Sequence, residues 1–328
     1  MKKVLTICVI GVLCCVPVPR SEAMMNGSYG GYTTVSYSYP LWINNDEFLV
    51  AQVEHHVRYI HDFTSSERPY RDDGYVIKRN INTGEETIVF KTVDSDIYGM
   101  SYCFKTEKLY LSMKDQLHPP AKDDPWLMRQ PKLHEYDLRT GTLKVLLDNV
   151  LRPRVSPDGD IVAFVRKYEY NTKTSRVNSC KETIRFYFMN TGEVKNSFLY
   201  SGLWDPSNGL FYCKQKNLST KQLESFWYDP YTNETKPFTG FGKRLCAISN
   251  DASLYMSCNS RYDQHKKKEI QNDVDYGGQV SISPDNLRIL FVSYLKTKKS
   301  HVVLHDLTTG KIQVLYTNER IEHKKKLP

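Results

Sequence analysis

A hairpin pattern that recurs along the chain constrains its fold more than any other feature. The turn Ser156-Pro157-Asp158-Gly159, with apolar residues on both sides, returns as Ser283-Pro284-Asp285-Asn286. Weaker copies occupy residues 204–212 and 248–256. Each copy is a short apolar run, a tight turn and a longer apolar or aromatic run, which is typical of a β-hairpin. Hairpins repeated at wide intervals predict an all-β repeat architecture.

Aligned on their turns, the hairpins number six, centred near Asn44, Lys105, Pro157, Pro206, Asn250 and Pro284. A second marker, an apolar strand that runs into a Thr-Gly turn, follows most copies. It is found at Gly84, Gly141, Gly192 and Gly310, and Asn233 takes the glycine position in a variant. Gly and Asn tolerate the positive φ that hairpin turns require. The fifth copy has no clear second marker.

Each unit therefore contains four antiparallel strands, which we name a to d. Such units stacked around an axis form a β-propeller, so we predict an all-β, six-bladed β-propeller of four-stranded antiparallel blades with almost no helix. The aromatic content of 12% suits broad packing between blades. Strands c and d of the fifth blade are expected between about residues 266 and 276. That blade is truncated if this segment forms a single strand.

The Ser-Pro-Asp-Gly hairpin and the Asp-Leu-x-Thr-Gly turns at residues 137–141 and 306–310 together resemble the TolB-like six-bladed propeller repeat. The resemblance covers about residues 38–317. It implies the fold but no single function, because the same blades serve as periplasmic binding scaffolds and as front domains of prolyl-oligopeptidase-like enzymes. The chain has no Gly-x-Ser-x-Gly elbow, so we expect no appended hydrolase domain.

The start of the chain predicts export. Lys2 and Lys3 precede an apolar run from Val4 to Val18, and small residues stand before a cleavage point after Ala23, as in a secretory signal peptide. We therefore divide the chain into a signal peptide (1–23), an N-terminal segment that is a candidate closing strand (24–37), the propeller (38–317) and a basic C-terminal tail (318–328). The predicted location is periplasmic or secreted.

The net charge of +8 predicts attraction to anionic partners. The leader carries three basic residues and one acidic residue, so its removal leaves +6. Part of this charge forms lysine clusters at residues 266–268, 296–299 and 324–326, where solvated turns and a frayed tail are the alternative interpretation. A peripheral contact with a membrane surface stays open. Nucleic acid is disfavoured as a partner by the export signal rather than by the charge.

Binding residues are expected on the long loops between strands b and c, because variable loops on a rigid scaffold carry most binding sites. Those loops are longest in the first three blades, so the predicted binding wall is lopsided. Its candidates from the loops are His56, Arg58, His61, His118, Trp126 and Arg129, and its candidates from the connections between blades are Arg152, Arg154 and Trp204. The alternative is that these loops only cover the propeller.

Catalytic and metal chemistry receive less support from the sequence. His55 and His56 are adjacent on a predicted strand, so their side chains point to opposite faces; we expect a polar loop here, with no metal and no cofactor. A glycosidase needs two facing carboxylates, and nothing in the sequence pairs the loop acids. The leading hypothesis is a non-catalytic binding or scaffold protein for a protein, peptide or anionic glycan. The alternative is an exported propeller enzyme that acts on a carbohydrate or a lactone.

Five cysteines follow the predicted leader, and an oxidising compartment permits disulfides. Cys246 and Cys258 are expected on strands a and b of blade five. A turn near residues 250–252 would place them roughly opposite each other, so we predict a disulfide between them. The odd count leaves at least one thiol free or paired between chains.

Overall fold

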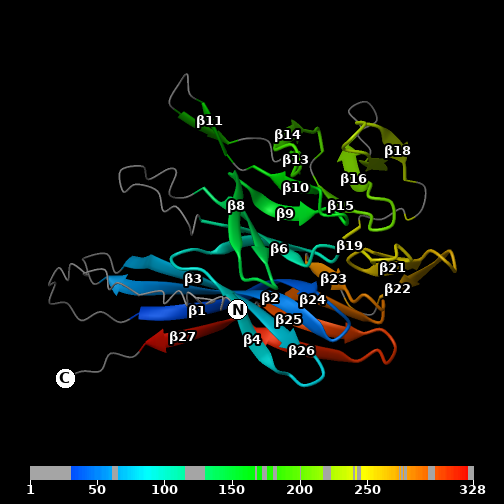
Figure 1. Ribbon diagram of the computed structural model, residues 1–328. Helices are drawn as coiled ribbons and strands as arrows, with labels where there is room; N and C mark the ends of the chain where they lie inside the picture. Colours follow the sequence, from blue (N-terminus) through cyan, green and yellow to red (C-terminus); the bar gives the residue numbers. More distant parts are fainter. Residues whose placement is uncertain are drawn as a thin grey trace, which may run out of the picture.

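The computed structural model describes residues 31–60, 66–114, 130–166, 168–171, 176–179, 183–199, 201–216, 223–238, 241, 245–272, 274, 276, 279–294 and 300–323. These residues form strands, turns and bends and no helix. Within these ranges there is accordingly no helix of the length and hydrophobicity needed to cross a membrane. Six antiparallel sheets, each with four strands from one blade and the first with one additional strand, are arranged as the blades of a propeller (Figure 1), which confirms the predicted fold class.

Each of the six blades is one sheet whose strands follow in chain order. Blade one contains β1 (Gly31–Trp42), β2 (Glu47–Ile60), β3 (Ser66–Asn80) and β4 (Glu86–Lys91), and blade two contains β5 (Ile97–Cys103), β6 (Lys108–Met113), β7 (Lys132–Asp137) and β8 (Leu143–Asp148). Blade three contains β9 (Leu151–Val155), β10 (Ile161–Val165), β13 (Ile184–Phe188) and β14 (Glu193–Asn196), with the hairpin β11 (Tyr168–Asn171) and β12 (Arg176–Ser179) inserted between strands b and c.

The second half of the chain continues the same order. Blade four contains β15 (Gly202–Trp204), β16 (Phe211–Lys216), β17 (Leu223–Tyr228) and β18 (Thr235–Pro237), and blade five contains β19 (Ala247–Ile248), β20 (Leu254–Met256), β21 (Ser260–Asp263) and β22 (Lys268–Gln271). Blade six contains β23 (Val280–Ile282), β24 (Arg288–Tyr294), β25 (Ser300–Asp306) and β26 (Ile312–Thr317), and β27 (Glu319–His323) follows it.

The core consists of six apolar clusters, one between each pair of neighbouring blades. Alternation along a strand explains this arrangement, because successive side chains point to opposite faces. On β2, Phe48 and Val50 pack toward Leu290 of blade six, whereas Leu49 and Ala51 pack toward Leu109 of blade two. Each blade thus buries both faces against its neighbours, and the ring closes between blades six and one.

The predicted turns near Pro157, Pro206, Asn250 and Pro284 all connect strands a and b of their blades. In the best-matching turn, the Ser156 hydroxyl donates to Asp158 and accepts from the backbone N–H of Ile161. The same two bonds recur at Ser249 and Ser283. Turns of neighbouring blades contact one another, as in the hydrogen bond from Asn286 to Asp251 of 2.9 Å. They therefore share one face of the ring.

The second predicted marker is the turn between strands c and d. Gly84, Gly141, Gly192 and Gly310 have φ between 71° and 75°, and Asn233 has φ of 62°. In blade five the left-handed position is taken by Lys267, with φ of 47°. A lysine in this position is uncommon, which explains why no second marker is visible in the fifth copy.

Blade five is complete but short, and its strand c was predicted too late in the chain. Strand c is β21, which begins at Ser260, and only strand d (β22) lies within residues 266–276. The reason is a tight connection between strands b and c, in which the Ser257 hydroxyl accepts from the Ser260 backbone N–H at 3.1 Å. This turn replaces the longer loop of the other blades.

The predicted disulfide between Cys246 and Cys258 is not formed, and both thiols are free. Ala247 pairs with Met256, so the register places Cys246 opposite Ser257 and Cys258 one step further. The Cys246 thiol lies 3.4 Å from the Met256 carbonyl oxygen. Burial, with a smaller contribution from Cys258, raises the pKa of the Cys246 thiol to about 12, which keeps the reactive thiolate scarce.

The two ends of the described chain meet on blade one. Residues 31–37, assigned from the sequence to the N-terminal segment, belong to β1, the inner strand of that blade. Within residues 318–328, assigned to a basic tail, β27 forms a strand that pairs with the start of β1 and lies beside it in Figure 1. The signal-peptide residues lie outside the described part of the chain.

Candidate functional site

A cavity of about 580 Å³ runs along the propeller axis and is lined by the first strands of the blades. Two smaller cavities, of about 340 and 200 Å³, adjoin it. Tyr39 and Arg152 line both the first of these and the axial cavity, and Arg154 and Cys246 line both the second and the axial cavity. Because the cavities share these residues, the three are grouped as one candidate site, which we call the axial site.

The axial site is rich in positive charge. Its charged lining residues, within the described part of the chain, are Arg152, Arg154, Lys214 and Asp96. Burial raises the pKa of the Asp96 carboxyl above its usual range, so this acid offsets less of the positive charge as the pH falls. Aromatic and apolar walls include Trp204 and Met100. The site therefore suits an anionic ligand with some apolar surface.

A close approach of two inner strands positions Arg152. Its backbone has φ of 50°, in the left-handed region, and it stands next to Gly99 of β5. A Cβ on Gly99 would lie 2.7 Å from the Pro153 ring and 2.9 Å from the Arg152 Cα. Only glycine lets β5 and β9 approach this closely without displacing the backbone that carries Arg152.

Arg154 is held by the neighbouring blade. Its guanidinium donates to the carbonyl oxygen of Gly202, and the Trp204 indole N–H donates to the Arg154 carbonyl oxygen at 2.8 Å. Trp204 is only 9% exposed and packs edge-on against Phe186 and Phe211. Trp204 is therefore mostly a core residue that orients Arg154, with part of its ring in the wall of the axial site.

The structure separates the remaining predicted site residues from this cavity or leaves them undescribed. His56 lies on β2 in the part of blade one that extends beyond the end of β4, and it is not among the residues that line the axial site. Arg58 continues the same strand, β2. The side chain of Arg58 and the residues His61, His118, Trp126 and Arg129 lie outside the described part of the structure.

The predicted opposite orientation of His55 and His56 is confirmed. His55 lies on the same face of β2 as Val53, which packs against blade two, and its Nδ1 lies 2.9 Å from the Asp72 carboxylate. This hydrogen bond raises the pKa of His55. On the other face, His56 lies near Glu54 and Asp73. Asp73 was one of the loop acids that the sequence could not pair, because its position opposite Glu54 depends on the register between β2 and β3.

Lys214 and Asp96 of the axial site were missed by sequence reasoning. Lys214 lies near the end of β16, and Asp96 lies in the connection from blade one to blade two. A single charged residue in such a place carries no local signal. The only clue available in the sequence was position, since strand ends and connections of a propeller border its axial opening.

Comparison with known proteins supports the fold. No sequence-family profile matches the chain, and no curated protein matches it in sequence. Among solved structures, TolB from Acinetobacter baumannii is similar with a TM-score of 0.51 and 12% identity, covering 90% of this chain and 80% of that one. At this identity the likeness concerns architecture alone. The chain folds as a six-bladed β-propeller similar in architecture to TolB.

Similar structures also include enzymes. An oligogalacturonate lyase in complex with manganese has a TM-score of 0.47 and 13% identity, covering 89% of this chain and 91% of that one. An acylaminoacyl peptidase has a TM-score of 0.49 and 14% identity, covering 86% of this chain but only 46% of the peptidase. Likeness at this level concerns the fold alone.

Proposed function

We propose that this protein is an exported, non-catalytic binding protein whose axial site takes an acidic peptide segment of a protein partner. The observation that carries the proposal is the cluster of Arg152, Arg154 and Lys214 around the axial site, which has apolar walls. Arginine pairs with carboxylates through its planar fork of donors. The leader-like residues 1–23 support export.

The mixture of charge and apolar surface favours a peptide over an anionic glycan. Leu41, Met100 and Phe104 line the axial cavity together with the arginines. A peptide offers apolar side chains for such walls, whereas a polyuronic acid offers mainly hydroxyls and carboxylates. The anionic glycan remains an outcome that the experiment distinguishes.

The alternative is an enzyme that acts on a carbohydrate or a lactone, and one observation favours it. Asp96 is partly buried and has a raised pKa in a cavity, which is a frequent property of catalytic acids. A glycosidase of the common type needs a second carboxylate across the cavity. Asp96 is the only carboxylate among the described lining residues, so we rank this function second.

Fluorescence anisotropy with a labelled decapeptide of alternating glutamate and leucine tests the proposal, with an oligogalacturonate and a neutral Gly-Ser peptide as competitors. We expect the protein to bind the acidic peptide, with an affinity that falls as salt is added. Arg152→Gln and Arg154→Gln should each weaken binding by about tenfold or more, because each removes a charge-assisted contact worth about 1.5–3 kcal/mol.

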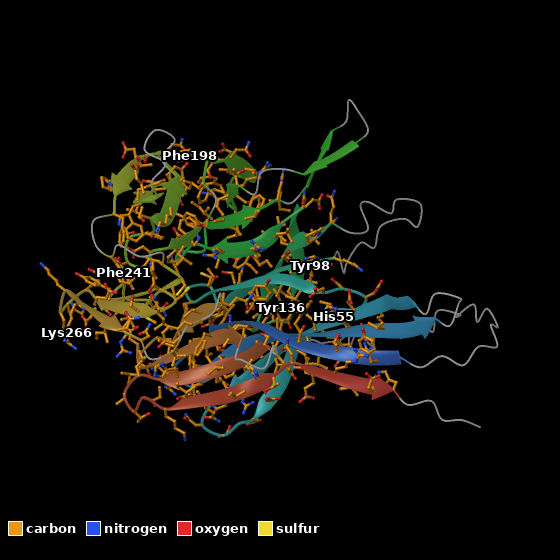
Figure 2. The ribbon with its side chains drawn as sticks, turned by 180° about the vertical axis from the view of Figure 1, so that it is seen from behind. His55, Tyr98, Tyr136, Phe198, Phe241 and Lys266 are labelled. Carbon is orange, nitrogen blue, oxygen red and sulfur yellow. The ribbon has the colours of Figure 1, made fainter. Side chains whose placement is uncertain are left out.

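Lys266→Gln is the matched control, because it also removes one positive charge but at a residue that does not line the axial cavity. Lys266 lies on the opposite side of the molecule from His55 in Figure 2. Its side chain is 74% exposed, so its folding and binding should be unchanged. Equal binding by the double variant Arg152→Gln/Arg154→Gln would refute the proposal. Stronger competition by the oligogalacturonate than by the unlabelled peptide would replace the peptide with a glycan.

A further inference from the structure

A second cluster of polar and charged side chains lies on blade one, where β1, β2 and β3 extend beyond the end of β4. Glu54 and His56 are two residues apart on β2, so they share a face of the sheet. The register places Asp73 of β3 opposite Glu54, and Thr33 of β1 opposite His56. We infer that Glu54, His56 and Asp73 form a binding site for a divalent transition-metal ion, and that zinc is the best fit.

The spacing of the three ligand atoms supports this inference. The Nε2 atom of His56 lies 3.6 Å from Asp73 Oδ2 and 3.8 Å from Glu54 Oε2, and all three ligand atoms lie within 4.8 Å of one another. Zinc binds histidine nitrogen and carboxylate oxygen at about 2.0–2.2 Å in tetrahedral geometry, which separates neighbouring ligand atoms by about 3.4 Å. A small inward adjustment of side chains would complete three zinc bonds.

The surroundings of His56 favour the same ion. Its Nδ1 atom lies 2.9 Å from the Thr33 hydroxyl, which lies 2.7 Å from Nε2 of His323 on β27. In one direction of this chain, His56 Nδ1–H donates to Thr33 and Thr33 donates to His323. That direction leaves a lone pair on His56 Nε2, which faces the two carboxylates. Histidine ligands of metals are usually oriented by such a bond from their other nitrogen.

Charge and exposure also fit. Arg71 donates to both oxygens of Asp73, at 2.8 and 2.6 Å, and so holds the buried carboxylate in place while one of its lone pairs remains for a metal. Glu54 and Asp73 carry two negative charges against the one positive charge of Arg71, so the cluster is net negative and attracts a cation. The side chains of His56 and Glu54 are 20% and 27% exposed, which leaves a fourth coordination position open to water or a partner's ligand.

Zinc titration of the metal-free chain from residue 24 to 328, followed by calorimetry, tests the inference. We expect one zinc per chain, and cobalt in its place should give the visible absorption of a tetrahedral site. Thr33→Val should weaken zinc binding roughly 10- to 100-fold, because it removes the partner that orients His56. His56→Ala and Glu54→Gln remove ligands and should weaken it further.

His55→Ala is the matched control, because it removes a neighbouring histidine that points to the other face of the same strand. It should bind zinc as the unmodified chain does. Glu54→Gln is preferred to a change at Asp73, since the buried Asp73 carboxylate also pairs with Arg71 and its loss would disturb the fold as well as the site. Unchanged zinc binding by both His56→Ala and Glu54→Gln, or an equal loss in His55→Ala, would overturn the inference.

Discussion

The aspartates of the turns between strands a and b stabilise these turns through side-chain hydrogen bonds. In blade five, the Asp251 carboxylate accepts the Ser249 hydroxyl at 2.7 Å, the Ser253 backbone N–H at 2.9 Å and the Asn286 amide of blade six at 2.9 Å. Partial burial alone would raise the pKa of Asp251, but the hydrogen bonds together hold it well below its usual range. One residue thus closes its own turn and joins two blades.

Asp251→Asn should therefore lower the free energy of unfolding at neutral pH by about 1 kcal/mol, since an amide accepts fewer hydrogen bonds than a carboxylate. The folded-state pKa is lower than the unfolded one, so the stabilisation is present above about pH 4 and is lost as the pH falls through the folded-state value. Urea unfolding at pH 7 and pH 3 measures this. The difference in the free energy of unfolding between the unmodified chain and Asp251→Asn should be smaller at pH 3 than at pH 7.

The control for this measurement is Asp160→Asn, at an exposed position in the equivalent turn of blade three. It should leave the free energy of unfolding unchanged at both pH values. An Asp251→Asn difference that grows on acidification would contradict the assigned direction of the pKa shift.

At the scale of single elements, the shortest inner strands depend on close packing. The three-residue strand β15 begins with Gly202, which pairs with Cys213 of β16. A Cβ on Gly202 would overlap the ring of Phe211 and the carbonyl oxygen of Tyr212. The backbone atom cannot rotate away, so any side chain here separates strands a and b of blade four.

Gly202→Ala should accordingly lower the melting temperature, by the equivalent of about 1–3 kcal/mol or more, as overpacking of a core does. Thermal unfolding followed by circular dichroism measures the effect. Gly209→Ala in the turn of the same blade is the control: it has φ of 70° and nothing within 4 Å of an added Cβ, so only the left-handed backbone is penalised, by about 1 kcal/mol. A larger loss for Gly209→Ala than for Gly202→Ala would contradict the packing argument.

At the scale of the whole molecule, the ring closes through contacts between blades six and one. Tyr316 stacks on Tyr37 with ring centroids 4.6 Å apart, and the Tyr37 backbone N–H donates to the Asn318 side chain at 3.0 Å. Directly after Asn318, β27 pairs with β1 over residues 31–35. The last described strand, β27, therefore connects the end of blade six to blade one through its pairing with β1.

A chain that stops after Asn318 should have a lower melting temperature and be cut faster by proteases near β1, because the edge of β1 loses its partner. A chain that stops after His323 keeps β27 and removes only residues 324–328. It should behave as the full chain does. Equal melting temperatures of the two truncated chains would show that the apolar contacts between blades close the ring without β27.

The sequence by itself determined the local features of this protein. Ser-x-Asp turns, glycines with positive φ and alternating apolar residues act within a few neighbouring positions, so the hairpins and their assembly into six blades were predictable. The same patterns led to Arg152, Arg154 and Trp204 as candidates but assigned them to connections between blades, whereas they lie on the inner strands β9 and β15. Where a local marker was missing, as at Lys267, the prediction of blade five was displaced.

The tertiary structure alone decided which distant residues meet. Asp73 joins Glu54 and His56 through the register of two long strands, and Lys214 joins Arg154 through the packing of neighbouring blades. The predicted Cys246–Cys258 disulfide is not formed, and the register that it assumed is off by one residue, since Cys246 lies opposite Ser257. Register and blade spacing come from the packing of the whole ring, and no short segment of sequence encodes them.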